Sequence, residues 1–283
     1  MLKQIDSSKF DSVDIIVIDN NSTDNTKYEV EKFNSSKIKY IFEPNQGLSY
    51  ARNSGYKAAK SEWVAYLDDD ATAFPNWLDR IYWVITETDF DLFGGIYLPW
   101  YRDGKKKWYL DEYATNNTWM KYEKISELTI QNFSGGNCVF KKSILEEVGG
   151  FVGHLGMSGA TVSYGEESYI QNKIRACGYK IGFDPEMLIN HYVPLYKQTF
   201  PWFFVRAKAL GKVFWEVNGI TPSWHTIAVL TFAVPKSLII DTRYCYRRLK
   251  RKEYKFANAY IYVGEKFIYQ ISKIMTGVKL KLL

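Results

Sequence analysis

The chain has 283 residues and a mass of 33.0 kDa, enough for one large domain or two small ones. Hydrophobic residues make up 46% of it and charged residues 24%, which excludes disordered, collagen-like and low-complexity proteins. The net charge of +6 suits a nucleic acid, an anionic lipid or a phosphorylated ligand, and composition does not choose among them. Three separated cysteines without a CxxC pair argue against a disulfide framework or a structural zinc site.

Strands and helices are predicted to alternate along the first part of the chain. The expected elements are strands at 13–18, 38–42 and 63–67, a helix ending near Phe33, and a helix over 48–60. The first strand is aliphatic on both faces, which is typical of a buried parallel strand. This alternation predicts an α/β fold with a mostly parallel, Rossmann-like sheet flanked by helices.

The second part of the chain is predicted to continue this domain and then to become helical. The expected elements are strands at 91–100 and 179–183 and helices at 143–148 and 167–176, and a glycine pair lies in the segment 133–140. An aromatic and charged insertion lies at 101–128, and the pattern is helical after Pro201. We therefore expect an α/β domain over residues 1–200 and a basic, aromatic helical region over 201–283.

The positive charge is concentrated in the C-terminal region. From Lys236 onward there are 12 of the 37 Lys and Arg residues and 3 of the 31 Asp and Glu residues, which leaves 25 basic and 28 acidic residues before it. The apolar run at 226–240 is shorter than the roughly 20 residues that a membrane-spanning helix needs. Aromatic residues beside a basic cluster fit either an anionic membrane surface or helices that cover the α/β domain, and both alternatives stay open.

Acidic residues follow two of the predicted strands. Asp19 ends the first strand, and Asp68, Asp69 and Asp70 follow the strand at 63–67. In an open parallel sheet, ligands bind beyond the carboxyl ends of the strands, so both acidic groups are expected at one crevice. Adjacent carboxylates suit Mg²⁺ or Mn²⁺, although a solvated loop that caps a helix would have the same composition.

Five segments, in order, resemble the conserved blocks of a family 2 glycosyltransferase. They are IIVIDNNSTDNT (15–26), NQGLSYARNSG (45–55), WVAYLDDDATAFPNWL (63–78), SGGNCVFKKSILEEVGGF (134–151) and GEESYIQNKIRACGYKIGFDP (165–185). The resemblance covers roughly residues 10 to 195. It implies a GT-A fold, a nucleotide-diphosphate sugar donor, a divalent cation, Mn²⁺ or Mg²⁺, and inversion at the anomeric carbon.

The resemblance also implies roles for individual residues. Those expected at the nucleotide sugar are Asp19, Asn45, Arg52, Asp68 and Asp69, and those expected at the metal are Asp70, Asp68 and His191. The family's acidic pair falls on Glu166 and Glu167, where Glu167 replaces the commoner Asp as general base and Glu166 is the alternative. Arg52 is expected either at the phosphates or in an ion pair with the acidic cluster. A structural role for His191 is the alternative to a metal ligand.

The implied reaction is a single displacement by an acceptor hydroxyl of a glycan, a polysaccharide or a lipid-linked sugar. Aromatic residues of the insertion could stack on the acceptor or could pack in a core: Trp100, Tyr101, Trp108, Tyr109 and Trp119. The basic run at 247–252 lies in no recognisable nucleic-acid module, so nucleic acid is not expected as a partner. We expect a cytoplasmic protein, with peripheral attachment to the inner face of the plasma membrane if the tail binds lipid.

One departure from the family pattern concerns the start of the chain. Family members begin with a strand that ends in a segment like Pro-Thr-Tyr-Asn, and this chain starts inside the helix that follows it. A missing first strand would leave an exposed sheet edge or gap and weaken donor binding. The alternative function is therefore a catalytically impaired, truncated paralogue that acts as a membrane-associated binding or scaffold protein.

Overall fold

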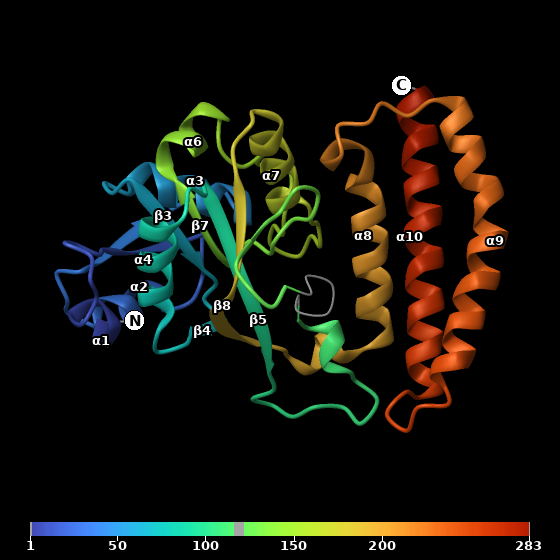
Figure 1. Ribbon diagram of the computed structural model, residues 1–283, viewed down its shortest axis with the longest axis horizontal. Coiled ribbons are helices and arrows are strands. Elements are labelled where there is room, and N and C mark those ends of the chain that lie inside the picture. The colour runs from blue at the N-terminus through green and yellow to red at the C-terminus, as the bar shows by residue number, and fades with distance from the viewer. Residues whose placement is uncertain (1, 116–121, 283) are drawn as a thin grey trace. The chain divides into compact units, whose positions relative to one another are not determined.

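The computed structural model describes residues 2–115 and 122–282, and the chain divides into two compact units (Figure 1). Unit 1 comprises Met1–Trp100, Ala114–Thr161 and Glu166–Tyr192, and unit 2 comprises Tyr101–Tyr113, Val162–Gly165 and Val193–Leu283. Each unit is described by itself below.

Unit 1 is the α/β part of the chain. Its helices are α1 (Leu2–Asp6), α2 (Thr26–Glu31), α3 (Leu48–Ala58), α4 (Trp77–Glu87), α6 (Lys142–Glu147) and α7 (Glu166–Ala176). Its strands are β1 (Ile15–Asp19), β2 (Ile38–Phe42), β3 (Trp63–Leu67), β4 (Ala71–Ala73), β5 (Leu92–Trp100), β6 (Ser126–Glu127), β7 (Asn137–Lys141) and β8 (Ile181–Tyr192). The α/β class and the helices that flank the sheet are confirmed.

The strands form two sheets, and the larger of them is mixed in direction. The larger has the order β3-β7-β5-β8-β4, with β6 paired to β8, while β1 and β2 form a separate parallel pair. Pairing is parallel between β5 and β8 and antiparallel between β3 and β7, β5 and β7, and β4 and β8.

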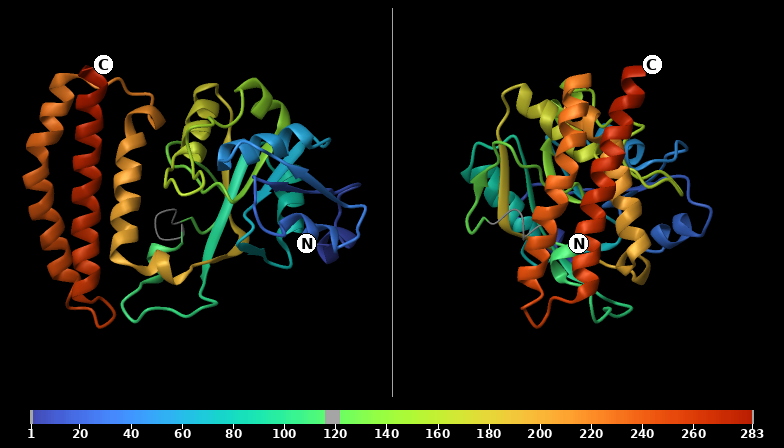
Figure 2. Two further views of the ribbon diagram at one scale, coloured as in Figure 1. Left: turned by 180° about the vertical axis from the view of Figure 1, so that it is seen from behind. Right: turned by 90° about the vertical axis from the view of Figure 1, so that its right-hand side faces the viewer.

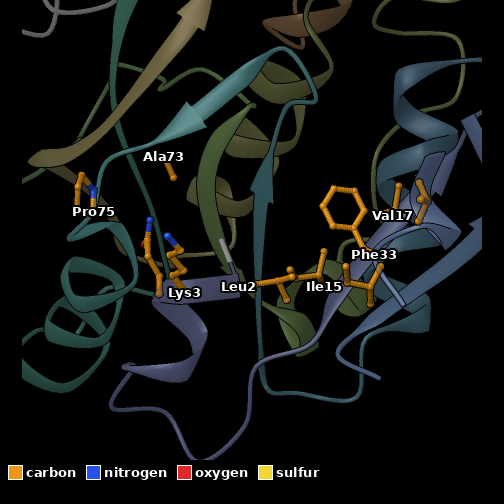
Figure 3. A pocket seen from close by; sticks show the side chains of 10 residues that line it. Leu2, Lys3, Ile15, Val17, Phe33, Ala73 and Pro75 are labelled. Atoms are coloured by element: carbon orange, nitrogen blue, oxygen red, sulfur yellow. The ribbon is translucent and has the colours of Figure 1, made fainter. Parts of the chain in front are cut away.

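Both β1 and β3 have an edge without a strand partner among the described residues. β1 pairs only with β2 there, and β3 lies at the end of the larger sheet. An apolar cavity of about 690 Å³ lies beside β1 and is lined from α1, α2 and the segment after β4 by residues that include Leu2, Val17, Phe33 and Pro75 (Figure 3).

Helices cover both faces of the larger sheet. One face packs against α3, α6 and α7 through Tyr56, Leu145 and Ile170, and the other against α1 and α4 through Ile5 and Trp77. Side chains of β5 alternate between the two cores, as the twofold period of a strand requires. The helix α4 is amphipathic and was not predicted from the sequence.

A register shift in β8 changes which of its residues face each core. Gly95 of β5 lies opposite Asp184, whereas the next residue, Ile96, lies opposite Leu188. Three extra residues on β8 exchange its two faces, because side chains alternate along a strand. Phe183 therefore packs in the core on the α7 side, and Ile189 packs in the core on the α4 side.

Unit 2 is helical, with α8 (Phe200–Val217), α9 (Trp224–Arg248) and α10 (Phe256–Leu282) and the short 3-10 helices η1 (Asp111–Tyr113) and η2 (Leu195–Gln198). The helix α10 packs along both α8 and α9 (Figure 2). Glycines allow close packing of α8 on α10, since a Cβ at Gly211 would lie 2.6 Å from the carbonyl oxygen of Tyr269. Over the residues that the structure describes, no helix is both long and apolar enough to cross a membrane.

Candidate functional site

Asp19 lies at the C-terminal end of β1 in a setting that stabilises its charge. It is buried, it accepts a hydrogen bond from the Ser22 amide at 2.9 Å, and the hydroxyl of Tyr40 on β2 donates to it at 2.6 Å. Burial alone would raise the pKa of Asp19, but the hydrogen bonds from Ser22 and Tyr40 outweigh it and lower that pKa. The same contact raises the pKa of Tyr40 to about 12.

The loop before α3 is held to the end of β1 by Asn20. The Asn20 amide donates to the carbonyl oxygen of Asn45 at 2.7 Å, and its oxygen accepts from the Gly47 amide at 2.6 Å. Gly47 has a φ of 147°, a conformation that glycine adopts readily. The Asn45 side chain is exposed and donates to Glu43 at 2.8 Å, so it lies at the rim of this loop.

Asp68, Asp70 and His191 converge at the end of β3. One possible ligand atom from each lies within 4.8 Å of the others, and the Nε2 atom of His191 is 3.2 Å from Oδ1 of Asp70. Partial burial, and after it the charges of Asp70 and Asp69, raise the pKa of Asp68 against the opposing effect of Arg52. Two carboxylates and an imidazole form an O,O,N donor set, and their mutual repulsion is relieved by a divalent cation, so the residues fit Mn²⁺ or Mg²⁺.

The strand pairing of β4 with β8 brings this cluster together. Ala71 lies opposite His191, and the Tyr192 amide donates to the carbonyl oxygen of Asp70 at 2.9 Å. The register shift of β8 places His191 on the same side as Tyr97 of β5, whose ring centroid is 5.2 Å from that of the imidazole. The position of His191 therefore depends on the three extra residues in β8.

Two glycines before β7 leave room for the charged side chains. A Cβ at Gly135 would lie 2.6 Å from the Arg52 guanidinium, and a Cβ at Gly136 would lie 1.9 Å from a carboxylate oxygen of Asp68. No L side chain fits at such distances. Gly136 also donates its amide to the Tyr97 hydroxyl and accepts from the Asp68 amide at 3.3 Å. The two glycines of the sequence SGGN thus leave the space that the Arg52 and Asp68 side chains occupy.

Arg52 connects the two acidic groups of unit 1. It projects from α3, is only 6% exposed, and donates to Oε1 of Glu166 at 2.9 Å, while its other terminal nitrogen is 3.7 Å from Asp68. Burial opposes its charge, but the charges of Glu166 and Asp68 outweigh burial and raise its pKa. Of the two alternatives raised by the sequence, the structure shows the ion pair with the acidic cluster.

Glu166 and Glu167 form the first turn of α7, where the helix dipole favours negative charge. Glu166 is buried and paired with Arg52. The Oε2 atom of Glu167 is buried without a hydrogen-bond partner in the described structure. Burial, followed by the charge and hydrogen bond of Glu166, raises the pKa of Glu167 well above its usual value. Glu167 therefore holds a proton more tightly than an ordinary glutamate does.

Several predicted residues lie outside this cluster. Asp69 is exposed and does not belong to the group of possible metal ligands, to which its neighbours Asp68 and Asp70 contribute. In unit 2, Trp108 and Tyr109 pack on Phe203 with ring centroids 6.1 Å away in each case, which is the core-packing alternative. Trp119 lies outside the described residues.

Sequence reasoning missed the residues that support the charged ones. Tyr40 and Tyr97 hold Asp19 and the Asp68 loop, and the Phe151 ring lies 5.5 Å from the Arg52 guanidinium. In the sequence, these residues are recognisable only as aromatic residues on a predicted strand or directly after a pair of glycines. Ordinary core residues have the same pattern.

Comparison of the sequence with known families gives one match. The family described as Glycosyl transferase family 2 matches residues 1–149, about half of the chain. The glucosyl-dolichyl phosphate glucuronosyltransferase of Haloferax volcanii is 26% identical over 181 residues, covering 61% of this chain and 54% of that protein. The GalNAc(5)-diNAcBac-PP-undecaprenol beta-1,3-glucosyltransferase of Campylobacter jejuni is 31% identical over 152 residues, covering 51% of this chain and 47% of that protein. The matched part of the chain thus spans about half the length of these relatives.

Solved structures show the same fold. The mannosyltransferase PcManGT from Pyrobaculum calidifontis, in complex with GDP-Man and Mn²⁺, has a TM-score of 0.60 at 18% identity, covering 98% of this chain and 81% of that one. TarS 1–349 of S. aureus, in complex with UDP-GlcNAc, has a TM-score of 0.52 at 14% identity, covering all of this chain and 87% of that one. At these identities the likeness establishes the fold.

Proposed function

The chain belongs to glycosyl transferase family 2, and from that premise we propose that it is an inverting glycosyltransferase. It moves a sugar from a nucleotide-diphosphate sugar to a hydroxyl group of an acceptor. One observation carries this proposal: unit 1 holds two acidic groups close together. The first is Asp68, Asp70 and His191, and the second is Glu166 and Glu167. Arg52 joins them through its contacts with Asp68 and Glu166. Carboxylates held together at a cost in repulsion, with a raised pKa at one of them, are typical of a catalytic site.

Asp68, Asp70 and His191 would hold a divalent cation, which supplies positive charge against the diphosphate of the donor when bound. Asp19 ends β1 and is kept ionised by its hydrogen bonds. Its carboxylate is therefore suited to accept hydrogen bonds from N–H groups of the nucleotide base. Asn45, Asp68 and Asp69 are proposed to contact the rest of the nucleotide sugar. Arg52 acts in this scheme by positioning Asp68 and Glu166, because its guanidinium is buried between them.

Glu167 is the proposed general base. Its raised pKa makes its carboxylate, once ionised, a stronger base toward the proton of the attacking hydroxyl than an ordinary glutamate is. Glu166 is less suited to this role, because its charge is already paired with Arg52. A hydrolase would need a second carboxyl group to protonate the leaving group, but a diphosphate leaves without one.

The acceptor is proposed to be a glycan, a polysaccharide or a lipid-linked sugar. The names of the two relatives above refer to a dolichyl phosphate and to a diphospho-undecaprenol, which are lipid carriers. A lipid-linked acceptor would bring the protein to a membrane surface, so we propose peripheral membrane association.

Calorimetric titration of UDP and GDP, with and without Mn²⁺, tests the donor site. We expect binding that needs Mn²⁺ and that weakens at least about tenfold in an Asp70→Asn variant, since a carboxylate ligand is lost. Asp79→Asn, on the exposed side of α4, removes one carboxylate outside the site and should bind as the wild type does. Binding without metal, or equal binding by Asp70→Asn, would contradict the proposal. The scaffold alternative is favoured by no observation in the described structure.

A further inference from the structure

The helix α9 presents an unusual surface on the side that does not pack on α10. Large apolar side chains are exposed there, with exposed fractions of 53% for Trp224, 83% for Phe232, 55% for Ile239 and Ile240, and 69% for Tyr246. Their spacing along the helix, with Val229, puts them on one half of its circumference. We call this surface the α9 face. Single exposed apolar residues are common, but a continuous row of this length needs an explanation.

The charged residues of the α9 face are all basic. Lys236, Arg243 and Arg247 lie exposed on the same half of the helix, and the loop that follows adds further Lys and Arg residues. The acidic residue of α9, Asp241, is only 4% exposed and pairs with Lys266 of α10 at 2.7 Å. The neighbouring acid Glu265 is likewise paired with Arg206 at 2.5 Å. These internal pairs remove negative charge from the surface and leave the positive charge outside.

We propose that the α9 face docks on an anionic lipid bilayer, with its apolar side chains in the interfacial region and its basic side chains at the phosphates. An interfacial helix needs this combination of apolar and basic residues along one face, with Lys and Arg reaching toward the headgroups. Trp224 and Tyr246 lie near its two ends, and such side chains favour the membrane interface. This inference deepens the proposed function by naming the surface through which the enzyme would meet a lipid-linked acceptor.

A second copy of the chain fits the α9 face less well. In a twofold contact the same residues meet each other, so Lys236, Arg243 and Arg247 would be brought toward their own copies without acidic partners. Like charges placed together in an interface are unfavourable. An anionic surface is the complementary occupant, and the fluid bilayer also accepts apolar side chains.

Sedimentation of the full chain with vesicles of phosphatidylcholine, with and without phosphatidylglycerol, tests the proposal. We expect binding to the anionic vesicles only, and weaker binding as salt is raised. Phe232→Ser should reduce the vesicle partition coefficient about tenfold or more, because the variant loses a Phe side chain that the bilayer would bury. The double variant Arg243→Gln/Arg247→Gln should reduce it about fivefold for each charge removed.

Matched controls come from exposed residues of unit 1. Ile130 is 80% exposed, so Ile130→Ser removes an apolar group of similar exposure, and Lys57→Gln/Lys60→Gln removes two exposed charges. Both controls should bind vesicles as the wild type does. Circular dichroism should show the same helix content in all variants. Asp70→Asn should retain vesicle binding, so failure of the donor site and failure of the lipid surface are separate results.

Four outcomes would overturn the proposal. They are equal binding to neutral vesicles, no binding to anionic vesicles, unchanged binding by both α9 variants, and a dimer that Phe232→Ser converts to a monomer without any lipid binding. A fluorescence titration with single-stranded RNA tests whether the basic residues of the α9 face bind a nucleic acid instead of a lipid surface. Tight RNA binding that is lost in Arg243→Gln/Arg247→Gln, without vesicle binding, would also overturn it.

Discussion

Arg52 and Glu166 form a buried ion pair with an N–O distance of 2.9 Å, although 114 positions separate them in the sequence. Each side chain is only about 6% exposed. The pair joins α3 to the first turn of α7 and, through the second contact of Arg52 with Asp68, connects Glu166, the neighbour of the proposed base Glu167, to the proposed metal site. The electrostatics of the site therefore depend on this one guanidinium.

Loss of either partner of this pair should destabilise unit 1 strongly. Glu166→Gln leaves buried Arg52 with only its 3.7 Å contact to Asp68, and Arg52→Met leaves Glu166 buried without its partner. Breaking a buried pair in this way costs about 3–5 kcal/mol in the free energy of unfolding. Urea unfolding measures this cost, and the double variant should recover part of it. Glu31→Gln, which breaks an exposed pair with Lys27, is the control and should change stability by less than about 1 kcal/mol. A cost equally small for Glu166→Gln would show that the buried pair is not maintained in solution.

Gly136→Ala should abolish divalent-cation binding. The added Cβ would lie 1.9 Å from the Asp68 carboxylate and must displace it from the group with Asp70 and His191. Titration with Mn²⁺ monitored by electron paramagnetic resonance measures the loss. The control is Gly55→Ala in α3, where the nearest atoms would be 3.8 Å away, an ordinary contact distance. Undiminished Mn²⁺ affinity in Gly136→Ala would refute the assignment of Asp68 to the cation.

Glu167→Gln should remove transfer activity but stabilise the protein at alkaline pH. The folded-state pKa of Glu167 is raised, so the neutral carboxyl contributes full stability below the unfolded pKa of glutamate and loses it as pH rises through the folded pKa. The loss is about 1.4 kcal/mol for each unit by which the pKa is raised, and Gln does not incur it. Thermal melts at about pH 4 and about pH 8 should show the larger gain over wild type at the higher value.

The same raised pKa predicts the acid limb of the activity profile. Because the base must be ionised, kcat/KM should fall with decreasing pH at a value above the ordinary pKa of glutamate. An acid limb near the ordinary value, together with no stability gain in Glu167→Gln, would show that Glu167 is ionised like a surface residue.

Tyr40→Phe should weaken nucleotide binding several-fold without removing it. The variant loses the 2.6 Å hydrogen bond to Asp19, which helps to lower the pKa of that carboxyl, but leaves the bond from Ser22. Since the pKa of Asp19 is lower in the folded protein than in the unfolded chain, the stability that this contact contributes is present above the unfolded-state pKa. It is lost as pH falls through the folded-state pKa. Calorimetry with UDP and GDP measures the change in affinity. Tyr28→Phe, at an exposed position of α2, is the control, and an equal effect there would exclude a specific role for Tyr40.

The sequence was sufficient to predict the elements whose hydrophobic pattern is local. The strands at 38–42 and 63–67 appear in the structure with these bounds, and the polar residues after β1 and β3 were recognised as site candidates. A buried strand that ends abruptly in acidic residues is a strong local signal, because no core can accommodate such a run.

The family resemblance named Asp68, Asp70 and His191 as one group, and the structure brings them together, but the contacts that do so join distant segments and could not be predicted. His191 reaches Asp70 only through the register shift of β8 opposite Gly95, and a register is set by pairing partners that a single sequence does not reveal. The choice between a phosphate contact and an ion pair for Arg52 was open for the same reason. It depends on Gly135, whose lack of a side chain lets the guanidinium lie against the backbone.

The most direct test of the central claim is the release of nucleoside diphosphate from a panel of UDP- and GDP-sugars, measured with wild type, Asp70→Asn and Glu167→Gln. We expect release that requires Mn²⁺ or Mg²⁺, that is lost on chelation, and that falls at least about a hundredfold in both variants. Asp79→Asn should release at the wild-type rate. Release that persists without a divalent cation, or that is unchanged in Asp70→Asn and Glu167→Gln, would contradict the account.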